Sequence, residues 1–147
     1  MTRHRILHHQ RRFAACVSGT AAVEFALLLP VYLFLLLGLV AYGIYFGAAH
    51  SVQQLSADAA RTAIAGLSPQ ERRTLAQQFI ERNAEGYMFI DRSRLAVEIG
   101  DSSADDSQFD VTLRYDASEL PIWGLWERLP MPERTIRRRA TIRMGGI

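Results

Sequence analysis

The chain has 147 residues and a formal net charge of +2, and its 17 basic residues are all arginine. The length corresponds to about one domain, and so small a net charge indicates no nucleic-acid partner. The single cysteine, Cys16, precedes the main apolar segment, so the part of the chain after it can form no intramolecular disulfide and must be stabilised by packing.

Residues 1–19 form a basic segment without any acidic residue. Under the positive-inside rule such an end stays in the cytoplasm, and the C-terminal part is exported. A twin-arginine signal fits poorly because the following apolar run is long. A lipoprotein signal fits poorly because the apolar run follows Cys16 instead of preceding it.

An uncharged apolar run extends from Phe25 to Ala49. A helix that rises about 1.5 Å per residue would carry this run across a bilayer core of about 30 Å, so we expect one membrane-spanning helix. Pro30 is expected to loosen it locally. Small residues in the run could permit close approach of another helix in lipid; they are Gly38, Ala41, Gly43 and Gly47.

Glu24 lies at the leading edge of this run, where an acidic side chain is costly, by about 2.5–3.5 kcal/mol at the centre of the bilayer and less toward its surface. We therefore expect Glu24 to have a partner. One alternative is an ordinary signal anchor in which Glu24 lies at the headgroup boundary, either solvated or paired with Arg12.

The residues around Glu24 read Gly-Thr-Ala-Ala-Val-Glu-Phe-Ala-Leu at positions 19–27, followed by Leu-Pro at positions 29–30. This string resembles a class III prepilin signal and, more narrowly, the start of TadE-like proteins, the minor pseudopilins of tight-adherence (Flp, type IVc) pili. Phe25 departs from the tyrosine that is usual in the major Flp pilins and fits the pseudopilin branch. The resemblance implies that a prepilin peptidase cleaves between Gly19 and Thr20.

Cleavage there would create an amino group at Thr20 with a pKa of about 8, cationic at neutral pH and one helical turn from Glu24. The resemblance implies that this amine pairs with Glu24 of a neighbouring subunit in the assembly. It also implies the partners: a prepilin peptidase, other pilins or pseudopilins, and pilus assembly platform proteins.

The helical pattern continues through residues 51–65 without a breaker, so we expect one long helix over residues 21–65, ended by Gly66. The apolar side of its second half comprises Val52, Leu55, Ala59, Ala63 and Ile64.

A second helix is expected to begin with Ser68 as its cap, Pro69 at its first position and Glu71 closing a capping box. It should run to Glu85 and end at Gly86. Its buried side is expected to comprise Leu75, Phe79 and Ile80.

Three later segments alternate between apolar and polar residues, as half-buried strands do; they are residues 95–99, 109–115 and 135–144. The acids in the turn at residues 100–106 match no calcium-loop spacing. Arg138 interrupts the alternation of the third segment, and it would snorkel, pair with an acid such as Glu98, or mark a bulge.

Residues 116–134 form a long apolar loop bounded by prolines. It is either a lid folded over the sheet, with a short helix near residues 122–128, or a contact patch for another subunit or the membrane surface. Trp123 and Trp126 are the side chains expected to anchor such an interface.

We expect no enzyme. The exported part has a single histidine, His50, and no cysteine, so it cannot supply a His-based nucleophile relay or a Cys/His zinc site. We likewise expect no cofactor, no metal and no small-molecule substrate.

Together these observations predict a single-pass α+β protein with a long N-terminal helix, a short second helix and a small antiparallel sheet of about three strands. The expected domains are a prepilin leader at residues 1–19, a transmembrane helix at 20–49 and an exported head at 50–147. The resemblance implies a minor pseudopilin in the bacterial inner membrane that assembles or positions a tight-adherence pilus, with incorporation into the pilus left open. Two alternatives also remain open: an uncleaved single-pass envelope scaffold of a secretion system, and a secreted domain released by signal peptidase after Ala49.

Overall fold

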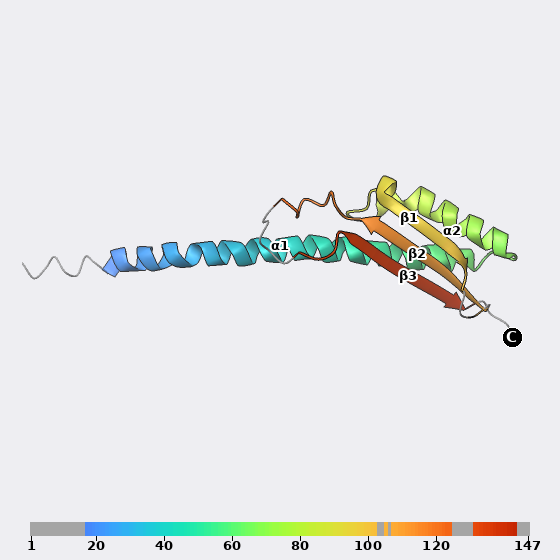
Figure 1. Cartoon of the computed structure of the whole chain (residues 1–147), viewed down its shortest axis with the longest axis horizontal. Coiled ribbons are helices and arrows are strands. Elements are labelled where there is room, and N and C mark those ends of the chain that lie inside the picture. The colour runs from blue at the N-terminus through green and yellow to red at the C-terminus, as the bar shows by residue number, and fades with distance from the viewer. Residues whose placement is uncertain (1–16, 103–104, 106, 125–130, 144–147) are drawn as a thin grey trace, which may run out of the picture. The chain divides into compact units, whose positions relative to one another are not determined.

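The computed structural model describes residues 17–102, 105, 107–124 and 131–143 (Figure 1). The chain divides into two compact units, residues 1–39 and residues 40–147. In chain order the elements are α1 (Val17–Ala63), α2 (Pro69–Asn83), η2 (Ala84–Gly86), η3 (Arg92–Arg94), β1 (Leu95–Asp101), β2 (Gln108–Asp116) and β3 (Thr135–Arg143). The predicted long helix, short helix and three-stranded antiparallel sheet are confirmed.

The long helix α1 has 47 residues, includes Pro30 and ends at Ala63, close to the predicted end. From residue 40 onward it has one buried face, and the apolar members of this face are Ala41, Ala48, Ala49, Val52, Leu55, Ala59, Ala60 and Ala63. Ile64 was predicted to belong to this face, but it is 62% exposed because α1 ends one residue before it and the chain turns there.

The start of α2 is capped as predicted, because the hydroxyl of Ser68 accepts a hydrogen bond from the backbone N–H of Glu71 at 3.2 Å. The Glu71 carboxylate accepts from the N–H of Leu67 at 2.9 Å, one residue before the cap. α2 ends at Asn83 and continues as the short helix η2. Its buried residues are Ala76 and Ile80, whereas Leu75 and Phe79 are only half-buried.

The sheet has the order β1-β2-β3, and both pairs of strands are antiparallel with an uninterrupted register. Arg138 is paired with Leu113 and therefore lies on the inner face, whereas Glu98 is paired with Thr112 on the outer face. The proposed pairing of Arg138 with Glu98 is wrong, and β3 contains no bulge between residues 135 and 143. The half-buried side chain of Arg138 reaches the carbonyl oxygen of Arg137 at 2.8 Å, as a snorkelling residue would.

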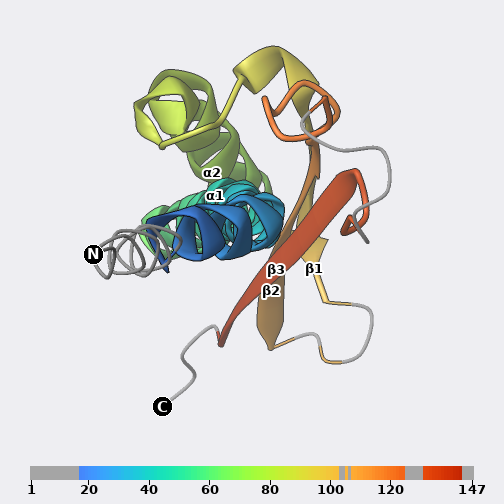
Figure 2. The same cartoon turned by 90° about the vertical axis from the view of Figure 1, so that its left-hand side faces the viewer.

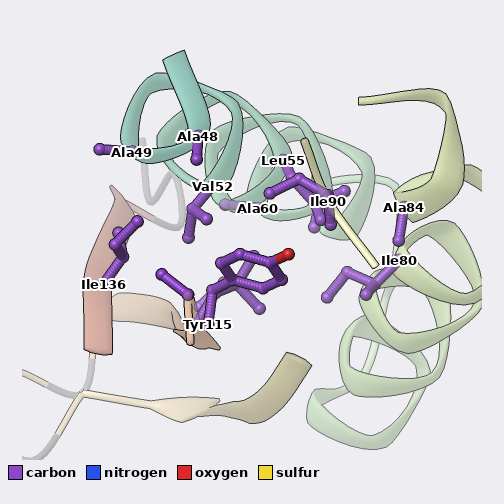
Figure 3. Packing of buried hydrophobic residues seen from close by; sticks show 14 of the residues in the cluster. Ala48, Ala49, Val52, Leu55, Ala60, Ile80, Ala84, Ile90, Tyr115 and Ile136 are labelled. Carbon is purple, nitrogen blue, oxygen red and sulfur yellow. The ribbon is translucent and has the colours of Figure 1, made fainter. Parts of the chain in front are cut away.

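The inner face of the sheet packs against α2 and the part of α1 that belongs to the second unit, and both helices lie on the same side of the sheet (Figure 2). The buried side chains of β2 on this face are Phe109, Val111, Leu113 and Tyr115. Figure 3 shows the ring of Tyr115 in the centre of the core, between Val52 and Leu55 of α1 and Ile80 of α2. These side chains form one hydrophobic core.

The described part of the loop between β2 and β3 folds onto this core, as the lid interpretation expects. Leu120 and Ile122 are buried, and Trp123 is half-buried. The indole N–H of Trp123 donates to the carbonyl of Ala117 at 2.5 Å, and the guanidinium of Arg134 lies 5.2 Å from the centre of the indole ring. Residues 121–124 form a turn, and most of the short helix expected at 122–128 lies outside the described residues.

Other expectations also fall outside the described residues. They concern the leader up to Cys16, including Arg12, part of the turn at 100–106, Trp126 and Met144.

Candidate functional site

The expected cleavage position lies at the start of α1. Gly19 and Thr20 are both exposed, and a Cβ atom added at Gly19 would meet no other atom within 4 Å. The backbone around this peptide bond is therefore not covered by any described part of the chain.

Glu24 and Phe25 follow on the same helix, and both are exposed, Phe25 to 61%. Thr20 and Glu24 are four residues apart in α1 and so lie on the same face of the helix. Within the described residues, no ion pair involves Glu24. Any cationic partner of this carboxylate has to come from residues outside the described segments, from a cleaved N-terminus, or from another molecule.

The helix surface after Phe25 is apolar and exposed. Its large exposed side chains include Leu27, Leu28, Val31, Tyr32, Leu33, Leu35, Leu36 and Leu39. The helical stretch from Gly19 to Ala63 contains a segment long and apolar enough to cross a membrane. In water so large an exposed apolar surface would be unfavourable, whereas hydrocarbon chains would cover it.

Three alanines near the end of the apolar run belong to the core of the second unit, and Gly47 among them contacts Phe89, roles that the sequence did not indicate. Ala41, Ala48 and Ala49 are at most 3% exposed. At Gly47, an added Cβ would lie 3.0 Å from Cε2 of Phe89, so the Phe89 ring sits directly on the helix backbone. From the sequence, Ala41 and Gly47 were expected to form notches for another helix, whereas in the structure they pack against residues of the head. The alanines at helical spacing are compatible with either role, because small residues permit close approach both in lipid and in a protein core.

Aromatic rings gather on α1 beside this contact. The ring of Phe46 lies 6.0 Å from that of Tyr42 and 5.9 Å from that of Tyr45, measured between centroids. Phe46 is 62% exposed. Aromatic side chains at the end of an apolar run are typical of the boundary between hydrocarbon and water.

The carboxylates of the head have structural roles in turns and between strands. Hydrogen bonds from the serine two residues further along lower the pKa of Asp91, Asp105 and Asp116 below the usual value. Burial raises the pKa of Asp110, but hydrogen bonds from three polar side chains outweigh this effect and lower it overall; these side chains are Arg139, Thr141 and Ser102. Groups held in the charged form at neutral pH are poor proton donors.

One groove of about 400 Å³ lies between α2 and β1, and its lining includes Arg73, Gln77, Val97 and Ile99. A guanidinium nitrogen of Arg73 lies 3.7 Å from the Asp101 carboxylate. Among the described residues, no group of three or more histidine, cysteine, aspartate or glutamate side chains could hold a metal ion. The groove therefore offers amides and one ion pair rather than a set of reacting groups.

Comparison with known proteins adds one finding. A family model described as TadE-like protein matches residues 19–61, the segment that begins at Gly19 and contains Glu24 and Phe25. No curated protein and no solved structure shows significant similarity to the chain. The match covers most of α1, including both the exposed apolar part and much of the part that packs in the head. Over residues 19–61 the chain is therefore similar to the TadE-like family, as its N-terminal string predicted.

Proposed function

We propose that the chain is a minor pseudopilin that assembles or positions a tight-adherence pilus and is processed by a prepilin peptidase after Gly19. The observation that carries this proposal is the family match over residues 19–61, which begins at the proposed cleavage site. The exposed apolar surface of α1 supports it, because the same surface suits a bilayer before assembly and neighbouring subunits afterwards.

In this proposal residues 1–19 are the leader, residues 20–49 contain the membrane span, and residues 50–147 contain most of the exported head. The basic leader keeps the N-terminus in the cytoplasm, and the head lies outside the bacterial inner membrane. Residues 41–49 serve both parts, since one side of α1 there packs in the head while Phe46 remains exposed. The partners are a prepilin peptidase, other pilins or pseudopilins, and assembly platform proteins, and the role is structural, without catalysis.

The chemical role of Glu24 follows from its position. After cleavage, the amine of Thr20 would be the first group of α1, and the helix N-terminus adds its own partial positive charge. A Glu24 carboxylate of a neighbouring subunit that approaches this amine would be neutralised, and the cost of placing it among apolar helices would fall. Subunits would then be held in a fixed axial register.

The structure also bears on release of a soluble domain after Ala49. Ala48 and Ala49 are buried within a continuous helix, and cleavage between Ala49 and His50 would remove Ala41, Ala48 and Ala49 from the core. Signal peptidase acts on exposed chain, so these contacts favour retention of the helix.

The primary test is the N-terminal sequence and intact mass of the membrane-extracted protein from cells with and without their prepilin peptidase. A peptidase-dependent start at Thr20 is expected. A start at Met1 in both strains would support the uncleaved scaffold, and a soluble form starting near His50 would support the secreted domain. Gly19→Leu should block processing, and an unchanged mature N-terminus in this variant would show that the assigned site is wrong.

A second test addresses the charge of Glu24. Glu24→Ala and the nearly isosteric Glu24→Gln should leave cleavage largely intact and impair piliation, because both lack the carboxylate that pairs with the amine. Electron microscopy counts the pili, and immunoblotting reports processing. Normal piliation in both variants would contradict the pairing model without affecting the cleavage site.

A further inference from the structure

The connection between α2 and β1 contains a turn with two apolar residues at its tip (Figure 1). The N–H of Ile90 donates to the carbonyl of Tyr87 at 3.2 Å, which closes a four-residue turn around Met88 and Phe89. Phe89 has a φ of 63°, in the left-handed region. Turns with positive φ at this position usually carry glycine or asparagine, so a bulky aromatic residue there is unfavourable for the backbone.

Contacts on three sides hold this turn in place. The Phe89 ring lies on Gly47, the Tyr87 hydroxyl donates to Asp58 at 2.7 Å, and Ile90 is buried in the core. Gly47 and Asp58 are about 17 Å apart along the helix axis. The side chains of Tyr87 and Phe89 therefore reach in opposite directions along α1, and Phe89 reaches toward the N-terminal, apolar end.

Although the turn is held firmly, no described part of the chain covers its tip. Met88 is 68% exposed and Phe89 is 39% exposed. Phe46, the neighbour of Gly47 on α1, is 62% exposed. We call these three side chains, Phe46, Met88 and Phe89, the apolar turn surface. None of them carries a charge or a hydrogen-bond donor.

The depth of the apolar turn surface in a bilayer follows from the contact of Phe89 with Gly47. About 33 Å of helix separates Phe25, where the uncharged run begins, from Gly47. The hydrocarbon core is about 30 Å thick, and the bilayer with its headgroups is about 40–45 Å thick. A span that begins at Phe25 therefore puts Gly47, and the Phe89 ring on it, in the outer headgroup layer.

We propose that the apolar turn surface rests in the interfacial layer of the bilayer that α1 crosses, so that the head is fixed against the membrane by a second contact beside the helix. This inference rests on the proposed membrane span. Aromatic and long apolar side chains are stable at this depth. The surface has only three side chains, far fewer than the 20–30 residues per side of a standard stable protein interface, about 800 Å² per partner. One of its three members, Phe46, belongs to α1 itself at the end of the apolar run, which favours lipid as its occupant.

The arrangement would have a consequence for the head. A single helix leaves a head free to rotate about the helix axis, whereas a turn that dips into the interface selects one orientation toward the membrane. The unfavourable φ of Phe89 would then be retained because it directs the ring to this position.

Site-directed spin labelling of the full chain in phosphatidylethanolamine and phosphatidylglycerol vesicles tests the proposal. Cys16 is the only native cysteine, so Cys16→Ser gives a background in which single labels can be attached through Met88→Cys or Phe46→Cys. Leu33→Cys provides a label within the span, and Leu67→Cys provides a control at a residue that is 94% exposed. The measurement compares the collision rate of each label with oxygen, which concentrates in lipid, and with a water-soluble nickel complex.

We expect the ratio of oxygen to nickel collision rates at positions 88 and 46 to be several-fold higher than at position 67 and lower than at position 33. If position 88 resembles position 67 while position 33 is protected from nickel, the apolar turn surface is in water and the inference is wrong, although the span stands. If position 88 is shielded from both reagents, a protein covers the surface and the inference is also wrong. If position 33 itself is accessible to nickel, the proposed membrane span fails.

Discussion

At the scale of single residues, the contact between Tyr87 and Asp58 joins the turn after α2 to α1. Burial, followed by the hydrogen bond to Asp58 and the charge of Asp58, raises the pKa of Tyr87 from 10.0 to about 12. The other oxygen of Asp58 lies 2.6 Å from a guanidinium nitrogen of Arg61. The phenol therefore keeps its proton in the folded protein at pH values where an unfolded chain would lose it.

Tyr87→Phe should lower the free energy of unfolding by about 1–2 kcal/mol at neutral pH, since it removes a hydrogen bond to a charged acceptor. Because the folded pKa is raised, the stabilisation from Tyr87 is fully present below pH 10 and is lost as the pH rises through about 12. The wild-type protein should therefore lose more stability than the variant over this interval. The chain has no lysine that would titrate there.

Spectrophotometric titration of tyrosinate checks this assignment. The difference between the wild-type and Tyr87→Phe curves isolates one phenol, which should titrate near pH 12. A difference curve centred near pH 10 would show that the hydrogen bond to Asp58 does not form in solution.

At the scale of elements, the connection between α1 and α2 depends on close approach at Gly66. A Cβ atom added there would lie 2.7 Å from the backbone nitrogen of Arg72 and 2.8 Å from its Cγ. The first turn of α2 thus lies against the end of α1, and the Ser68 cap fixes where α2 begins. The nitrogen of Arg72 cannot move easily, since it belongs to the backbone of α2.

Gly66→Ala should lower the free energy of unfolding by about 1–3 kcal/mol, because the helix must shift to accept the methyl group. Gly86→Ala is the matched control, since a Cβ there meets no atom within 4 Å, and it should change stability by no more than about 0.5 kcal/mol. Thermal unfolding in detergent, followed by circular dichroism, measures both. Equal effects of the two substitutions would show that α2 does not lie on Gly66 as described.

At the scale of the whole molecule, one helix supplies both the apolar segment suited to a membrane and a large part of the core of the head. Val52 and Leu55 of α1 are fully buried, whereas Leu33 and Leu39, earlier on the same helix, are exposed. The two tasks can therefore be separated by substitution at different positions on a single element.

Leu55→Ala should destabilise the head by about 2–5 kcal/mol, since it leaves a cavity in the core. It should not release the protein from the membrane, because the apolar run is unchanged. Leu67→Ala is the control, because Leu67 is 94% exposed, and it should have little effect on either property. Protease sensitivity of the head and resistance of the membrane-bound chain to carbonate extraction report the two properties. Loss of membrane association in Leu55→Ala alone would contradict this separation.

The features that depend on local pattern could be predicted from the amino-acid sequence. The uncharged run after Glu24 indicated a helix that could span a membrane, Ser68 and Pro69 marked the start of α2, and alternation marked the strands. The family resemblance was visible for the same reason, because it rests on one contiguous string that begins at Gly19. Helical and strand periodicity and capping all act over a few residues, so they can be read without knowing the fold.

How the segments pack against one another depends on long-range contacts and could not be predicted in this way. The burial of Ala41 and the contact of Gly47 with Phe89 depend on residues far away in the sequence. An apolar pattern alone therefore could not show whether these positions face lipid or the head. The left-handed backbone at Phe89 was not predictable either, since that conformation suits glycine and is maintained here by long-range contacts. The face of the sheet on which Arg138 lies was established only by the register of β3 against β2, which sets the face of every side chain in the strand.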